Sequence, residues 1–142
     1  MQNLKKKILT FLIILVIMVI LDFIWLGIIN KSYFADVIKK LNCGGGVKRN
    51  WPSIIITYLV MAFTLYYFVF HLPDDDISVR TVVMRAIIVA MGTYVVFDFT
   101  LMNMASAWGW NDAMKDIIWG NILFTTVAIA TYYLVFKWKF IG

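Results

Sequence analysis

The sequence predicts an all-α fold: an integral membrane bundle of four transmembrane helices, formed as one domain by the whole chain of 142 residues. Apolar residues make up 63% of the chain and charged residues only 15%, whereas soluble domains contain about 45–50% and about 25%. A chain this short cannot bury so much apolar surface in water, because small domains have little interior for their surface. The composition therefore excludes an ordinary soluble enzyme, a disordered chain and a disulfide-stapled secreted domain.

Four apolar runs are long enough to cross a bilayer, which takes roughly 20 helical residues for about 30 Å of hydrocarbon. Inside the bilayer a backbone must satisfy its own polar groups, so a run of this length favours a helix. A β-barrel would need many alternating segments of about ten residues, and none occur. The expected spans are residues 8–29, 54–71, 82–104 and 117–136.

The first run follows three lysines, Lys5 to Lys7, as the core of a signal peptide would. Residues 8–29 are longer than the roughly 7–15 residues of such a core, and no small-residue cleavage site follows them. We therefore expect an uncleaved first span. Basic residues divide almost evenly between the two sides, and the lysine cluster favours a cytoplasmic N-terminus in a bacterial inner membrane.

The connections contain the polar and turn-forming residues. Apolar residues would share one face of a short interfacial helix over residues 33–41. The glycines at 44–46 would break this helix, and Trp51-Pro52 would open the second span with a headgroup anchor and a helix-starting proline. The third connection, residues 106–112, is aromatic and polar.

The rare residue types exclude several kinds of site. Cys43 is the only cysteine, so no intrachain disulfide and no two-thiol redox relay can form. His71 is the only histidine, and beside Asp74–Asp76 we expect it to be solvated surface, so we expect neither a metal site nor a cofactor. The net charge of +5 comes from cations flanking the apolar runs, which is typical of headgroup contacts and argues against nucleic-acid binding.

Three aspartates inside or at the edge of the apolar runs are the main candidates for function. Asp22 and Asp98 lie toward the C-terminal ends of the first and third runs, and Asp116 opens the fourth. The first and third helices cross the bilayer in the same direction, and the fourth starts on the side where they end. We therefore expect the three carboxyl groups to converge near one membrane face, which would be the outer one if the N-terminus is cytoplasmic.

Tryptophans accompany two of these aspartates. Asp22 and Trp25 share the pattern Asp-x-Ile-Trp with Asp116 and Trp119, and a glycine follows closely in both. Positions three apart share a helix face, so each acid would pair with its own tryptophan, and each glycine would let another helix approach. The expected site residues are Asp22, Trp25, Asp98, Asn103, Asp116 and Trp119, with Trp108, Trp110 and Asn121 in secondary roles.

An aspartate inside a membrane costs roughly 2.5–3.5 kcal/mol, so it persists where a partner compensates for its charge. Clustered carboxylates hold protons more strongly, and tryptophan faces attract organic cations. A structural explanation stays open beside this one. Asp116 would cap a helix start, and tryptophans are common at membrane interfaces. Hydroxyl groups in the second and fourth spans, including that of Tyr58, are expected to bond between helices.

The stretches Asp22-x-x-Trp25-Leu26-Gly27, Phe97-Asp98-Phe99-Thr100 and Asp116-x-x-Trp119-Gly120 resemble, in order and spacing, those of an uncharacterised bacterial family of small four-helix inner-membrane proteins. The resemblance covers nearly the whole chain. It implies a multi-pass bacterial membrane protein and supplies no reaction. Family members have an asparagine directly after the threonine, whereas Leu101 and Met102 separate Thr100 from Asn103 in this chain.

The leading hypothesis is a small proton- or cation-dependent transporter or ligand-binding membrane protein. Asp22 and Asp98 would bind a proton or cation, Asp116 would tune them, and Trp25 and Trp119 would line the ligand. The partners would be the bilayer and a small cationic ligand, and a homo-oligomer is expected because four helices make a thin wall. Two alternatives remain: an enzyme acting on a lipid or isoprenoid with the aspartates as general acid and base, and a structural subunit of a membrane complex.

Overall fold

The computed structural model describes residues 4–46, 48–71 and 77–138, and these ranges contain helices and no strand. The α-helices are α1 (Leu4–Ile24), α2 (Lys31–Leu41), α3 (Trp51–Leu65), α4 (Val79–Met104) and α5 (Trp110–Thr131). The π-helical segments η1 (Trp25–Ile29), η2 (Tyr66–His71) and η3 (Tyr132–Lys137) continue α1, α3 and α5. Four of the resulting helices are long and apolar enough to cross a membrane: Leu4–Ile29, Trp51–His71, Val79–Met104 and Trp110–Lys137. The predicted membrane bundle of four helices is confirmed.

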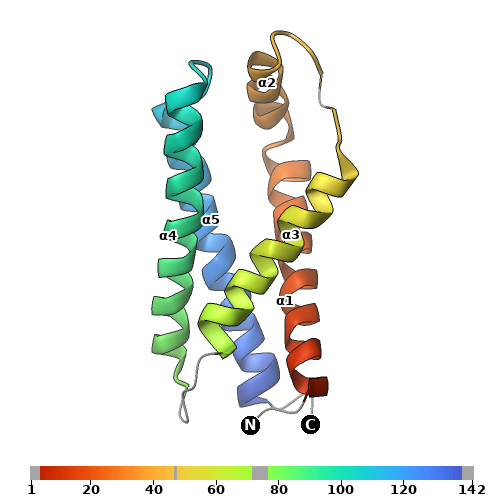
Figure 1. Cartoon of the computed structure of the whole chain (residues 1–142), viewed down its shortest axis with the longest axis vertical. Coiled ribbons are helices and arrows are strands. Elements are labelled where there is room, and N and C mark those ends of the chain that lie inside the picture. The colour runs from red at the N-terminus through yellow and green to blue at the C-terminus, as the bar shows by residue number, and fades with distance from the viewer. Residues whose placement is uncertain (1–3, 47, 72–76, 139–142) are drawn as a thin grey trace.

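The four long helices form one bundle, with α3 crossing it obliquely and α2 at the end opposite the two termini (Figure 1). The core lies where α1, α3, α4 and α5 meet, and its fully buried side chains include Met18, Leu65, Ala90 and Phe124. The outward faces are also apolar and exposed, for example at Ile20, Val60, Ile88 and Ile122. Helices that are apolar on all sides are typical of membrane spans.

The helices begin several residues before the apolar runs, because the first turn of a helix can be polar and hydropathy does not detect it. Asn50 accepts from the backbone N–H of Ser53 at 3.2 Å, with Pro52 in the first turn of α3 as predicted. The α5 helix begins at Trp110, where the backbone N–H of Gly109 donates to Asp112 at 3.1 Å. The prediction that Asp116 opens the fourth helix is therefore wrong, because Asp112 occupies the first turn.

The predicted short helix after the first span is α2, and it ends where the glycines begin. Asn42 follows the last residue of α2, and the next two residues have positive φ angles, 51° at Cys43 and 91° at Gly44. Positive φ reverses the chain direction and is the conformation that glycine adopts most readily. The predicted glycine break is confirmed.

The α2 helix packs on the start of α5 and on Trp108 in the connection before it. The Tyr33 hydroxyl donates to Oδ1 of Asp112, and Nζ of Lys115 lies 3.9 Å from the centre of the Tyr33 ring. Partial burial, with the hydrogen bond to Asp112, raises the pKa of Tyr33 above its ordinary value of 10.0. A small buried cluster lies beside this contact: Val37, Trp108 and Ala113.

Candidate functional site

Four polar side chains reach the same level of the bundle, away from the termini. Asp22 lies seven residues before the end of η1, and Asp98 lies six residues before the end of α4. Asp116 lies six residues after the start of α5, and Tyr58 seven residues after the start of α3. At a rise of about 1.5 Å per residue, each lies about 10 Å inside its helix end. Residues that are far apart in the sequence therefore lie at a common depth in the bundle, as the number and direction of the spans predicted.

Asp22 joins three helices through its carboxylate and is only 7% exposed. Its Oδ1 atom accepts the indole N–H of Trp119 on α5 at 2.8 Å, and its Oδ2 atom accepts the hydroxyl of Tyr58 on α3. Hydrogen bonds to a charged acceptor are about twice as strong as bonds between neutral groups. Asp22 therefore holds α1, α3 and α5 together at this level.

The two Asp-Trp motifs interlock. The indole that binds Asp22 comes from Trp119, and the ring of Trp25 stacks on that of Trp119, with centroids 4.4 Å apart and an interplanar angle of 7°. The prediction that Asp22 pairs with Trp25 is therefore wrong. The tryptophan three residues away belongs to the π-helical segment η1, which changes the direction of its side chain relative to a regular helix.

Asp98 is fully buried beside Asp116. Its Oδ1 atom accepts the indole N–H of Trp108 at 3.2 Å, and Oδ2 has no hydrogen-bond partner among the described residues. The half-buried Asp116 carboxyl group is close enough for the two charges to interact, although no hydrogen bond joins it to Asp98 among the described residues. One proton shared between the two carboxyl groups would leave the pair with a single negative charge.

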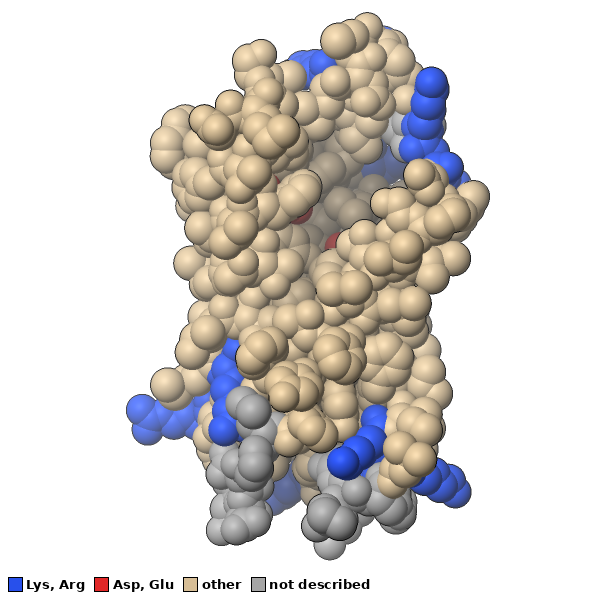
Figure 2. All heavy atoms as spheres, viewed as in Figure 1, with Lys and Arg blue, Asp and Glu red and all other residues tan. Residues whose placement is uncertain are grey.

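A cleft of about 500 Å³ lies at this level, and both Asp22 and Asp116 line it. Asp98 does not line the cleft. Asp22 and Asp98 were the two aspartates expected to bind the ligand, but the two that line the cleft are Asp22 and Asp116. Figure 2 shows the hollow between α4 and the N-terminal half of α3, with acidic atoms at its floor. The other lining residues are Leu26, Ile54, Thr57, Tyr58, Met61, Thr93, Tyr94, Phe97 and Trp119.

Close packing of α4 on α5 supports the floor of the cleft. Gly120 is buried, and a Cβ atom at this position would overlap the ring of Tyr94. The Tyr94 ring in turn packs edge-on against Phe124, with centroids 5.6 Å apart. At Gly27 the three atoms nearest to an added Cβ atom all belong to Phe23 of the same helix. Only Gly120 of the two motif glycines therefore admits a neighbouring helix, whereas both were predicted to do so.

Six of the nine predicted residues do not line the cleft. Trp25, Asp98 and Trp108 lie against one another or against a lining residue as described above, and the other three lie apart from it. Asn103 is exposed at the end of α4, and Trp110 is 66% exposed. The Asn121 amide donates to the carbonyl of Ile117 in its own helix at 2.9 Å. Asn103, Trp110 and Asn121 are residue types that suit such a site, but their side chains do not reach the cleft. The sequence could not show this, because it does not determine how each helix is rotated about its axis.

Tyr58 and Tyr94 were missed as components of the site. Tyr58 was expected to bond between helices, which it does, but its acceptor is the candidate residue Asp22. The available signal was its position, because it lies as far inside the second helix as the aspartates lie inside theirs. In the described part of the chain no group of three or more His, Cys, Asp or Glu residues is placed to hold a metal ion, and Asp74–Asp76 lie outside that part.

Comparison with curated proteins and with solved structures finds no match. A family model described as "Predicted membrane protein (DUF2177)" matches residues 7–133, which include α1 through α5 almost entirely and every residue that lines the cleft. The match covers far more than half of the chain. The chain therefore belongs to this family of membrane proteins.

Proposed function

We propose that the protein binds an amphiphilic organic cation in the cleft, with Asp22 and Asp116 as its counter-charges. When the cleft is empty, a proton on Asp116 takes the place of the cation. The observation that carries this proposal is the presence of two carboxyl groups in one cleft whose other walls are mainly apolar and aromatic.

The charge of the cleft favours a positive ligand. Its described lining contains no lysine, arginine or histidine. Lys115, although adjacent to Asp116 in the sequence, lies over the ring of Tyr33. A carboxylate removed from water is costly unless a cation or a proton compensates its charge. A bound cation would do so at both aspartates, and a bound proton would do so at Asp116.

The walls of the cleft suit the apolar part of such a ligand. Leu26, Met61 and Phe97 offer aliphatic and aromatic surface, and the rings of Tyr94 and Trp119 lie among them. Aromatic faces attract organic cations, by about 0.5–2 kcal/mol for each contact. A strongly hydrated inorganic ion would gain little from these walls, so an amphiphile is the better fit.

The position of the opening supports entry from the bilayer. The hollow lies between α3 and α4 on the side of the bundle (Figure 2), where a spanning helix faces lipid tails. A lipid-soluble cation would reach the two aspartates sideways, without passing the headgroups. If the cleft took up the cation from one side of the membrane and released it in exchange for a proton on the other side, the protein would be a transporter.

Binding of tetraphenylphosphonium to the purified full chain tests the proposal, measured by equilibrium dialysis in detergent. Asp22→Asn and Asp116→Asn should each weaken binding by roughly ten- to a hundredfold, since each removes a charged partner worth about 1.5–3 kcal/mol. Asp36→Asn is the matched control, because Asp36 is exposed on α2 and does not line the cleft. Equal affinity in all three variants, or no binding by the wild type, would overturn the proposal.

We also propose that the termini face the cytoplasm of a bacterial cell, with the cleft toward the outer face of its inner membrane. The lysines at positions 5–7 favour this direction, because basic residues close to a first span tend to stay inside.

The Asp98–Asp116 pair favours one second function, an enzyme acting on a lipid or isoprenoid. Adjacent carboxyl groups that share a proton are suited to general acid–base catalysis. Such an enzyme would leave its lipid substrate accumulated in a strain that lacks the gene or carries Asp98→Asn. An unchanged lipid profile in both strains would exclude it.

A further inference from the structure

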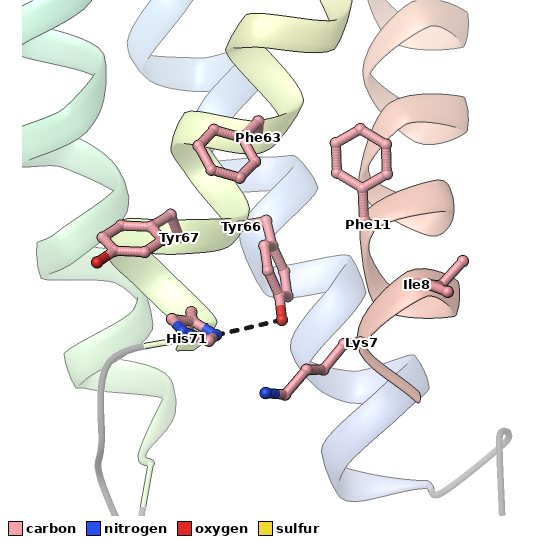
Figure 3. Close-up of a pocket in the computed structure, with 7 residues that line it drawn as sticks. All are labelled: Lys7, Ile8, Phe11, Phe63, Tyr66, Tyr67 and His71. Atoms are coloured by element: carbon pink, nitrogen blue, oxygen red, sulfur yellow. Dashed lines mark hydrogen bonds between the residues drawn. The ribbon is translucent and has the colours of Figure 1, made fainter. Parts of the chain in front are cut away.

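A second pocket lies near the other end of the bundle, between α1 and the η2 end of α3 (Figure 3). Its volume is about 410 Å³. Figure 3 shows Lys7, Tyr66 and His71 at the end nearer the termini, and Phe11 and Phe63 farther toward the middle of the bundle. The pocket therefore has a polar end and an apolar end.

The π-helical segment η2 builds the polar end. Hydrogen bonds in a π-helix join residues five apart, and the Oη atom of Tyr66 lies 3.4 Å from Nδ1 of His71, five residues later. When Tyr66 donates to Nδ1, the Nε2 atom of His71 carries its hydrogen and can donate to a ligand. The rings of Phe63, Tyr67 and His71 pack in succession beside these groups, with centroids 5.9 and 5.1 Å apart.

Lys7 is the cation of this pocket. The neighbouring lysine, Lys6, lies over the ring of Phe136 at 5.2 Å, and Arg85 donates to the carbonyl of Val69 at 3.3 Å. The described residues that line the pocket include Lys7 and no acidic side chain. The pocket is therefore complementary to a negative group.

Both Lys7 and His71 lie close to the ends of membrane-spanning helices, three residues after Leu4 and at the last residue of η2. Phospholipid headgroups lie at this depth, and the acyl chains lie deeper, at the level of Phe11 and Phe63. Polar groups at headgroup depth with an apolar wall below them match the two parts of a lipid.

We propose that this pocket binds one anionic phospholipid. Its phosphate accepts from Nζ of Lys7 and from the His71 ring, and one acyl chain lies along Phe11 and Phe63. This lipid site is separate from the aspartate cleft and does not depend on the function proposed for that cleft.

Native mass spectrometry of the full chain tests this proposal, with phosphatidylglycerol and phosphatidylcholine of the same acyl chains added to the detergent-solubilised protein. We expect one strongly retained phosphatidylglycerol, bound about tenfold more tightly than phosphatidylcholine, since a phosphate paired with a lysine gains a charge-assisted bond but phosphatidylcholine carries a compensating positive charge. Lys7→Gln should remove this preference.

Lys5→Gln is the matched control, because Lys5 is exposed on the same helix turn and does not line the pocket. It should leave the retained phosphatidylglycerol unchanged. Equal retention of both lipids by the wild type would overturn the proposal. So would equal losses in Lys7→Gln and Lys5→Gln, since these would show that only the overall charge of this end matters. Tetraphenylphosphonium binding by Lys7→Gln, where the wild type binds it, reports separately that the bundle is intact.

Discussion

Trp119 donates its indole N–H to Asp22 at 2.8 Å across 97 residues of sequence, while its ring stacks on Trp25. One side chain thereby connects the C-terminal end of the first span to the beginning of the last. Because Tyr58 donates to the same carboxylate, the acid that faces the cleft also fixes the arrangement of three helices. Binding chemistry and packing share a residue here, so variants at Asp22 need stability measurements beside their binding measurements.

Tyr58→Phe isolates the structural part of this contact. The variant keeps the ring but removes one donor to the carboxylate of Asp22. The free energy of unfolding should fall by about 1–2 kcal/mol, as for other hydrogen bonds to charged groups and between membrane helices. Reversible unfolding in mixed micelles measures it. Tyr133→Phe is the control, because the hydroxyl of Tyr133 has no hydrogen-bond partner in the described part of the chain; equal effects of the two changes would argue against the Asp22 contact.

Gly120→Ala tests the close approach of α4 and α5. The added Cβ atom would overlap the ring of Tyr94, so the variant should lose about 1–3 kcal/mol of unfolding free energy or more, as overpacked cores do. Gly92→Ala provides the comparison, because nothing lies within 4 Å of a Cβ there, and it should be neutral or stabilising by up to about 1 kcal/mol. A second change, Tyr94→Leu, should restore part of the stability of Gly120→Ala. Equal stability of the two alanine variants would contradict the packing described.

The docking of α2 should weaken in strongly alkaline solution. Burial and the contact with Asp112 raise the pKa of Tyr33 above 10.0, so the folded state keeps this proton while the unfolded chain loses it. The stability that this contact gives is complete below pH 10 and falls as the pH rises beyond it. Ultraviolet titration of tyrosinate, as the difference between the wild type and Tyr33→Phe, measures this ionisation. A difference that titrates at or below pH 10 would contradict the contact.

Cys43 reports the orientation of the chain. It is the only cysteine, it is exposed, and it follows α2 at the end opposite the termini (Figure 1). If the termini are cytoplasmic, a membrane-impermeant maleimide should label Cys43 in spheroplasts without permeabilisation, and Cys43→Ser should abolish the label. Labelling that requires permeabilisation would show the opposite orientation.

The sequence predicted the depth of the site better than its contacts. Asp22, Asp98 and Asp116 share a level because span number and helix length alone determine it, and both can be read from hydropathy. Which side chains meet depends on helix phase, and the π-helical segment at Trp25 changes that phase. The polar first turn of α5 also escaped prediction, because hydropathy detects the lipid-facing part of a helix and not its capped end.

Proton release on cation binding tests the central claim most directly, that the cleft holds in alternation a cation and a proton on Asp116. The measurement adds saturating tetraphenylphosphonium to the full chain in weakly buffered detergent at neutral pH and records the change with a pH indicator. The wild type and Asp36→Asn should release protons as they bind the cation, whereas Asp22→Asn/Asp116→Asn should release none. Cation binding by the wild type without proton release, or the same release from the double variant, would contradict this account.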